Sequence, residues 1–258
     1  MMYLLVAGGV FATTLVFTAI VRAAARYFKV VDIPEVAGRK IHKRPVPLLG
    51  GVALYGVISL AILFLLKWWP GVLTVNISSV ELLFVLLGGL IIIAGGVIDD
   101  KYDLPPKKQM IFPIAAVLIT FLGGIELLEI TNPFGGVLKL DSYSWGPIIV
   151  LGDALVFVWL LGMTYTTKLL DGLDGLATGV VGIGALMIAF LSLFTKYYQP
   201  DVALLAIILA AACGAFLLFN WHPASIFLGE GGSLFLGFFL GVLAVIAGGK
   251  IATTLLVM

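Results

Sequence analysis

Residues 168–179 read KLLDGLDGLATG, and they place Asp171 and Asp174 between two long apolar runs. The chain has 258 residues, of which 62% are hydrophobic and only 11% are charged. Its mean hydropathy is +1.19. A soluble core of this size does not need so much apolar surface, so the composition predicts an all-α polytopic membrane protein. Because a carboxylate is costly in lipid, we expect the two aspartates to line a polar cleft at a helix end.

The apolar runs define the expected membrane spans. A spanning helix needs about 20 predominantly apolar residues. By that criterion we expect about eight spans in one transmembrane domain covering residues 1–258. The expected spans are 3–27, 50–69, 81–98, 109–125, 147–170, 175–195, 201–219 and 232–256.

The placement of basic residues predicts the orientation of the chain. If the helices alternate in direction, most basic residues fall on the side that carries Lys101 and Lys168. The positive-inside rule then makes this side cytoplasmic and puts the N-terminus outside the cytoplasmic membrane. Since no basic stripe could meet a phosphate backbone, nucleic acid is not an expected partner; membrane lipids are.

The long outer connection, 126–146, contains EITNPFGGVLKLD. Polar and apolar residues alternate on both sides of an Asn-Pro-Phe-Gly-Gly turn. This pattern is typical of a small β-hairpin over the outer face. A plain ordered loop remains open as an alternative at this point.

Acidic residues gather on the predicted cytoplasmic side, in three loops that also contain glycines. Each loop alone is typical of a solvated helix cap, but acidic residues contribute little to orientation. Gly-rich turns offer backbone N–H groups to phosphates, and Mg²⁺ is usually held by one or two carboxylates together with substrate phosphates. The pattern therefore predicts magnesium-dependent phosphate chemistry, with Mn²⁺ as a second candidate metal. The acidic residues are Asp99, Asp100, Asp103, Asp171, Asp174 and Glu230, and a fourth, basic loop carries Arg39, Lys40 and His42.

Four sequence words carry a close resemblance to a known family: RKIHKRPVPLLGG, IDDKYDLPPK, LLDGLDGLATG and FNWHPASIFLGEGGSLFLG. The chain resembles the polyprenyl-phosphate N-acetylhexosamine-1-phosphate transferases, and PVPLLGG is similar to the GlcNAc-type branch. The resemblance implies transfer of a HexNAc-1-phosphate, most simply GlcNAc-1-phosphate, from a UDP-N-acetylhexosamine to undecaprenyl phosphate. The reaction releases UMP, uses Mg²⁺, and begins a cell-wall or surface polysaccharide pathway. A homodimer is expected only by analogy with relatives.

The resemblance also implies roles for individual residues. Asp99, Asp100, Asp171 and Asp174 are expected to be catalytic, and Asp171 and Glu230 to hold the metal. Further helices and a His-rich loop are expected beyond the end of the sequence, which would make this chain a fragment. The residues expected to contact substrates are Arg39, Lys40, His42, Asp103, Lys107, Lys168 and Asn220.

Two departures from the family pattern fall on the expected metal site. Lys168 stands where the family usually has asparagine, and Glu230 stands where it has aspartate. A protonated lysine cannot ligate Mg²⁺. We therefore expect either that Lys168 pairs with Glu230 and takes over part of the metal's charge role, or that Lys168 points into solvent while Mg²⁺ binds Asp171 and Glu230.

The chemistry leaves alternatives open. We favour direct attack of the lipid phosphate on the β-phosphorus, because that phosphate is largely dianionic at neutral pH. Asp99 would then accept a residual proton or orient the phosphate, and a two-step route through an aspartyl-phosphate remains open. The other expected functions are a catalytically impaired relative that binds UDP-sugar or lipid phosphate and, less favoured, an ion-coupled transporter.

Overall fold

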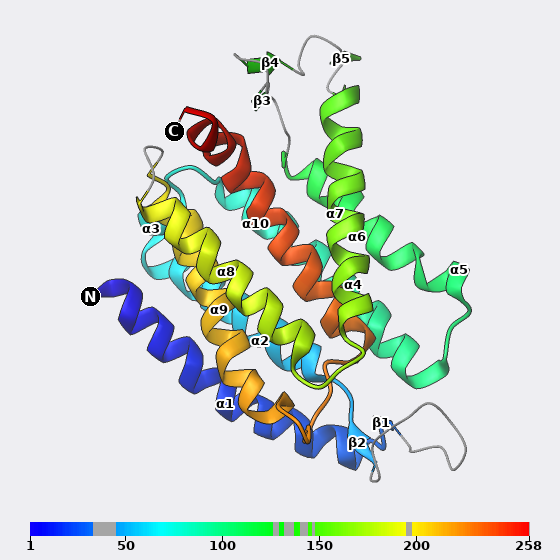
Figure 1. The fold of residues 1–258 in the computed structure, drawn as a ribbon. Coiled ribbons are helices and arrows are strands. Elements are labelled where there is room, and N and C mark those ends of the chain that lie inside the picture. The colour runs from blue at the N-terminus through cyan, green and yellow to red at the C-terminus, as the bar shows by residue number, and fades with distance from the viewer. Residues whose placement is uncertain are drawn as a thin grey trace.

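The computed structural model describes residues 1–32, 45–125, 129–131, 137–139, 144–145, 148–194 and 198–257. Within these residues the chain folds into a bundle of long helices (Figure 1). Seven helices are long and apolar enough to cross a membrane. They confirm seven of the expected spans and the all-α membrane fold. The seven are α1 (Met2–Tyr27), α2 (Gly50–Trp68), α4 (Ser79–Tyr102), α7 (Val150–Leu170), α8 (Leu176–Phe194), α9 (Pro200–Asn220) and α10 (Gly229–Val257).

The span expected at 109–125 differs from the prediction. Its main helix, α6 (Ile111–Leu122), has only 12 residues, a length of about 18 Å against the roughly 30 Å hydrocarbon core. The short α5 (Pro106–Gln109) precedes it. The reason is local, because two prolines restrict the backbone before α6, and Gly124 takes a left-handed conformation (φ 92°) after it.

Although short, α6 runs antiparallel along α4. Phe112 lies against Gly95 of α4, and Gly123 lies against Phe84 near the other end of that helix. The chain therefore passes from one side of the bundle to the other at this point. The strands at 129–131 and 137–139 and the C-terminal end of α4 consequently lie on opposite sides of the bundle (Figure 1).

The remaining elements are small. The predicted outer hairpin is confirmed in its strands, because β3 (Glu129–Thr131) pairs antiparallel with β4 (Val137–Lys139), with Ile130 opposite Leu138. Its turn lies outside the described residues. Two further strand pairs and one further short helix complete the elements: β1 (Val31–Asp32) with β2 (Val46–Pro47), β5 (Ser144–Trp145) with β6 (Ile148–Ile149), and α3 (Pro70–Leu73).

The central helix is α10, which packs against α2, α4, α7 and α8 (Figure 1). Its first turn meets two other helices backbone to backbone. A Cβ atom added to Gly96 of α4 would lie 2.1 Å from the Cα of Gly231, and one added to Gly51 of α2 would lie 2.3 Å from the Cα of Gly232. Such distances leave room for glycine alone. The GEGGS sequence thus allows α10 to begin wedged between α2 and α4.

The segment before α10 also pairs with the segment before α2. The N–H of Phe227 donates to the carbonyl of Pro47 at 2.8 Å, and the N–H of Gly51 donates to the carbonyl of Leu228 at 2.8 Å. These bonds satisfy backbone groups at the start of a helix, which otherwise lack partners. They fix the start of α2 beside the start of α10.

Substitution of Gly96 by alanine tests this close approach. The added methyl group would overlap the Gly231 backbone, which has no flexible atom to move aside, so we expect a loss of about 1–3 kcal/mol of stability. Thermal unfolding of the detergent-solubilised protein measures it. Gly162→Ala in α7 is the matched control, because no atom lies within 4 Å of a Cβ at that position. Equal stability of the two variants would contradict the predicted contact.

Candidate active site

The end of α4 carries the paired aspartates that the sequence singled out. Asp99 is buried, and its Oδ1 accepts hydrogen bonds from the N–H of Leu104 at 2.8 Å and from Nε2 of Gln109 at 3.1 Å. Asp103 is exposed, has a left-handed backbone (φ 50°), and donates its N–H to the carbonyl of Asp99 at 2.8 Å. Asp99 therefore organises the turn between α4 and α5.

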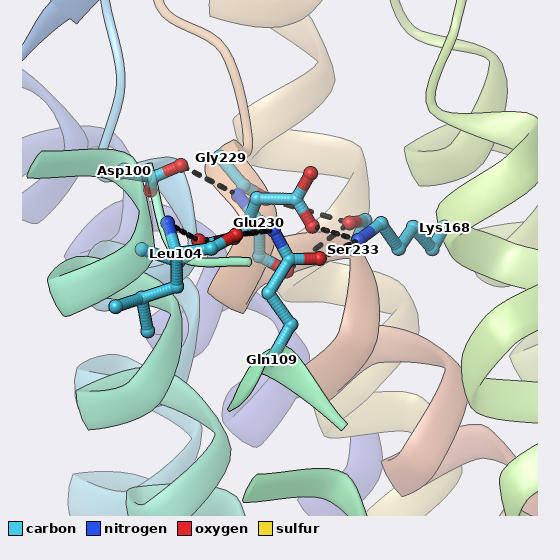
Figure 2. A network of polar contacts seen from close by, with 8 residues as sticks. Asp100, Leu104, Gln109, Lys168, Gly229, Glu230 and Ser233 are labelled. Carbon is cyan, nitrogen blue, oxygen red and sulfur yellow. Dashed lines mark hydrogen bonds and ion pairs between the residues drawn. The ribbon is translucent and has the colours of Figure 1, made fainter. Parts of the chain in front are cut away.

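Asp100 points instead at the beginning of α10. Its Oδ1 accepts a hydrogen bond from the N–H of Glu230 at 3.0 Å (Figure 2). A carboxylate is favoured there because the first N–H groups of a helix lack internal partners. The preceding residue must be glycine, since Gly229 has a φ of 73° and a Cβ on it would lie 2.5 Å from Oδ2 of Asp100.

Asp174 joins two loops. Its Oδ2 lies 2.9 Å from Nδ1 of His222 and accepts the N–H of Ala224 at 3.1 Å. The loop between α7 and α8 is thereby attached to the segment between α9 and α10. His222 was not among the residues expected at the site, because nothing in the sequence connects it with Asp174, 48 positions away.

Asp171 lies in the turn after α7 and is partly buried. Among the described residues its side chain makes no hydrogen bond or ion pair. Burial, together with the negative charges of Glu230, Asp100 and Asp174, raises the pKa of Asp171 to about 8. A group held this way is stabilised by any cation that approaches it.

A chain of polar contacts joins these elements (Figure 2). Nζ of Lys168, in the last turn of α7, lies 2.6 Å from Oε2 of Glu230 in an ion pair. The same ammonium donates to Oε1 of Gln109 at 3.3 Å. Gln109 also donates to Asp99 and to the carbonyl of Leu104. The predicted pairing of Lys168 with Glu230 is thus present, rather than a lysine that points away into solvent.

Asn220 and Lys107 were also expected to contact substrates, but neither makes a polar contact with this network in the described part of the chain. Asn220 is buried; it accepts from Oγ1 of Thr178 at 3.0 Å and donates to the carbonyl of Ile226 at 3.1 Å. It therefore ties α9 to α8 and to the segment before α10, and its contact with substrate stays a prediction. Lys107 is exposed beside the site. Arg39, Lys40 and His42 lie in 33–44, outside the described residues.

Gln109 is the site residue that sequence reasoning missed. It ends a PPKKQ stretch and looks like any polar residue at a helix start. Only the turn held by Asp99 directs its amide toward both Asp99 and Lys168. In the sequence, Gln109 lies close to the paired aspartates, but this position does not indicate where its side chain points.

A divalent cation such as Mg²⁺ requires oxygen ligands, and the acidic side chains of the site are the residues that could supply them. Asp171 and Glu230 offer carboxylate oxygens, the ligands that Mg²⁺ prefers, so the residues fit in kind. As the described side chains stand, however, no three His, Cys, Asp or Glu residues converge closely enough to hold a metal ion. One reason is that Glu230 is held by Lys168.

The fold and the site together define an integral membrane protein with a cluster of acidic residues at one end of its helix bundle. The model of the family described as "Glycosyl transferase family 4" matches residues 82–248, more than half of the chain. The chain therefore belongs to that family.

Curated relatives carry matching descriptions. The chain is 31% identical over 236 residues to a probable undecaprenyl-phosphate N-acetylglucosaminyl 1-phosphate transferase of Bacillus subtilis, covering 91% of this chain and 60% of the relative. It is 33% identical to a decaprenyl-phosphate N-acetylglucosaminephosphotransferase of Mycolicibacterium smegmatis, covering 91% and 57%. It is 29% identical to a phospho-N-acetylmuramoyl-pentapeptide-transferase of Caldicellulosiruptor bescii, covering 88% and 69%. The chain thus spans less than two thirds of the length of the first two.

The raised pKa of Asp171 predicts a pH dependence of stability. Because this pKa lies near 8 in the folded state and near 3.8 for a solvated carboxyl, the folded state binds one more proton than the unfolded state between these two pH values. The stability that this extra proton contributes is lost as the pH rises through about 8. Asp171→Asn removes the titrating group. We therefore expect the variant to gain more thermal stability over the wild type at pH 8.5 than at pH 5.5, in EDTA. An equal difference at both pH values would contradict the assignment.

Proposed function

We propose that this chain transfers a HexNAc-1-phosphate from a UDP-N-acetylhexosamine to a polyprenyl phosphate, with release of UMP. GlcNAc-1-phosphate and undecaprenyl phosphate are the proposed sugar and lipid. The observation that carries the proposal is the convergence of the ends of α4 and α7 and the start of α10 on one acidic site. The descriptions of the relatives support the substrate classes.

The proposed reaction is a phosphoryl transfer. An oxygen of the lipid phosphate forms a bond to the β-phosphorus of the UDP-sugar, and the bond from that phosphorus to the bridging oxygen breaks, so that UMP carries away the electron pair. The lipid phosphate is largely dianionic at neutral pH and needs little base catalysis. Positioning and charge neutralisation are then the main requirements.

The residues of this chain can meet these requirements in distinct ways. Lys168 offers an ammonium with three donors to a phosphate oxygen. Asp171, whose side chain has no partner in the described part of the chain and whose pKa is raised, is well suited to take up a proton or to bind a cation. Asp99 and Asp174 hold the surrounding loops in place. Two-step transfer through an aspartyl-phosphate stays an alternative.

We propose Mg²⁺, with Mn²⁺ as a substitute, as the metal of this reaction. Asp171 and Glu230 are the proposed ligands, and Asp100 lies beside Glu230. When bound, the metal would neutralise charge on the diphosphate. This role requires Lys168 to release Glu230, with which it forms an ion pair.

The proposed location is the cytoplasmic membrane, with the site on the cytoplasmic face and the N-terminus outside. Lys101, Lys107 and Lys168 lie on the side of the site, as the positive-inside rule requires. Anionic lipids would contact this basic face. The acidic residues lie at helix ends rather than in mid-helix, which disfavours the ion-coupled transporter. A homodimer stays a prediction.

UMP release by the full gene product tests the proposal. We expect UMP only when UDP-GlcNAc, undecaprenyl phosphate and Mg²⁺ are all present, with EDTA abolishing it. Asp171→Asn should lower the rate at least about 100-fold, whereas Glu81→Gln, at the far end of α4, should leave it unchanged.

Two results would contradict the proposal. UMP release without lipid phosphate would indicate a hydrolase. No UMP from a folded protein with any UDP-N-acetylhexosamine would favour a catalytically impaired relative. Folding is judged in each case by thermal unfolding and by elution as a single species in detergent.

A further inference from the structure

Several interactions stabilise the ammonium of Lys168 in its position. Lys168 is in the last turn of α7, where a cation is favoured by the helix dipole. Its ammonium contacts Glu230 at 2.6 Å and Gln109 at 3.3 Å. Gln109 is in turn fixed by two hydrogen bonds, to Asp99 and to the carbonyl of Leu104. The ammonium is therefore held in position rather than free to sample solvent.

The charges around Lys168 are unbalanced. Asp100 is bonded to the backbone of Glu230, and the charges of Asp100 and Glu230 both act on Asp171. Among the described residues, the cationic side chains that pair with the acidic residues of the site are Lys168 and, when protonated, His222 on Asp174. Among these residues, Lys168 is in contact with Glu230 alone, while Asp100 and Asp171 on the same side of the site have no cationic side chain paired with them.

We infer that Lys168 is the built-in counter-ion of this site and that a divalent cation must displace its ammonium from Glu230 in order to bind. The structure that carries this is the Gln109–Lys168–Glu230 contact. With the ammonium in place, the described acidic side chains do not converge on a common point. Two cations could share Glu230 only at the cost of their mutual repulsion.

When a divalent cation binds, the ammonium of Lys168 would move to a second position away from Glu230. The lysine side chain is flexible and about a quarter exposed (26%), so the ammonium can leave Glu230 without a change in the helices. Once released, it offers three donors to an anion bound in the same place. The metal and the freed ammonium would then bind a diphosphate from two sides. Gln109 acts here as a positioning residue, because it contacts the ammonium and holds it.

The inference deepens the proposed function and rests on it for the identity of the anion, but its test does not depend on turnover. Mn²⁺ is the probe, and its affinity for the purified protein in detergent, without nucleotide or lipid substrate, is measured by electron paramagnetic resonance of the free ion. The variants are Lys168→Met, which keeps the length of the side chain and removes the charge, and Lys168→Arg, which keeps the charge.

Lys101→Met is the matched control. It removes the same charge from the last turn of α4, on the side of the bundle where the site lies, but the Lys101 ammonium lies over the ring of Tyr102, 5.3 Å from its centre, rather than on a carboxylate of the site. We expect Lys168→Met to bind Mn²⁺ at least about tenfold more tightly than the wild type. Lys168→Arg and Lys101→Met should stay within about twofold of it. Unchanged or weaker binding by Lys168→Met would overturn the inference.

A second measurement uses the wild-type protein and covers the case in which Lys168→Met does not fold. Reductive methylation followed by mass spectrometry reports how accessible each lysine amine is. We expect saturating Mn²⁺ to increase the labelling rate of Lys168 and to leave that of Lys101 unchanged. A Lys168 rate that stays constant or falls would overturn the inference.

The two proposals fail separately. Turnover with unchanged Mn²⁺ affinity in Lys168→Met would leave the transferase standing and remove the counter-ion role. Tighter Mn²⁺ binding by Lys168→Met without UMP release by the wild type would support the counter-ion role and contradict the proposed transferase activity.

Discussion

The close approach of three helix backbones is the constraint on which the site depends. Gly51 of α2 and Gly96 of α4 meet Gly232 and Gly231 of α10 with no side chain between them. Separation by one carbon–carbon bond length, about 1.5 Å, would break the 3.0 Å hydrogen bond from the N–H of Glu230 to Asp100. The position of the Glu230 carboxylate, and with it the ion pair to Lys168, follows from this packing.

The charge arrangement follows from the same packing. Carboxylates that would each be solvated in an isolated loop are brought together, and the cost shows in the raised pKa of Asp171. Lys168 pairs with Glu230, one of the charges that act on Asp171, without contacting the carboxylate of Asp171. The result is a site that is partly neutralised and still attracts a cation, which suits a protein that binds phosphates together with a metal.

Much of the fold follows from the sequence because lipid allows few solutions. Apolar length alone locates the seven long helices, and alternation of direction places Asp100, Asp171 and Glu230 on one side. The fourth expected span was too long because apolar counting ignores the prolines before α6 and the left-handed Gly124 after it. Local backbone chemistry decides where that helix begins and ends.

The site was harder to predict than the fold. Its acidic residues were evident from their motifs, but their partners were not. The bonds from Asn220 to Thr178 and from Asp174 to His222 connect residues 42 and 48 positions apart. Gln109 lies 59 positions from Lys168. Such contacts depend on how helices pack, and no periodicity within one helix contains that information.

A double-mutant cycle on Lys168 and Glu230 tests the central claim most directly. Lys168→Met, Glu230→Gln and the double variant are compared with the wild type by their free energies of unfolding in EDTA. Because the pair is partly exposed, we expect a coupling of about 1 kcal/mol in favour of the pair. Strictly additive effects would show that the two side chains do not interact in the folded protein, and would contradict the account of the site.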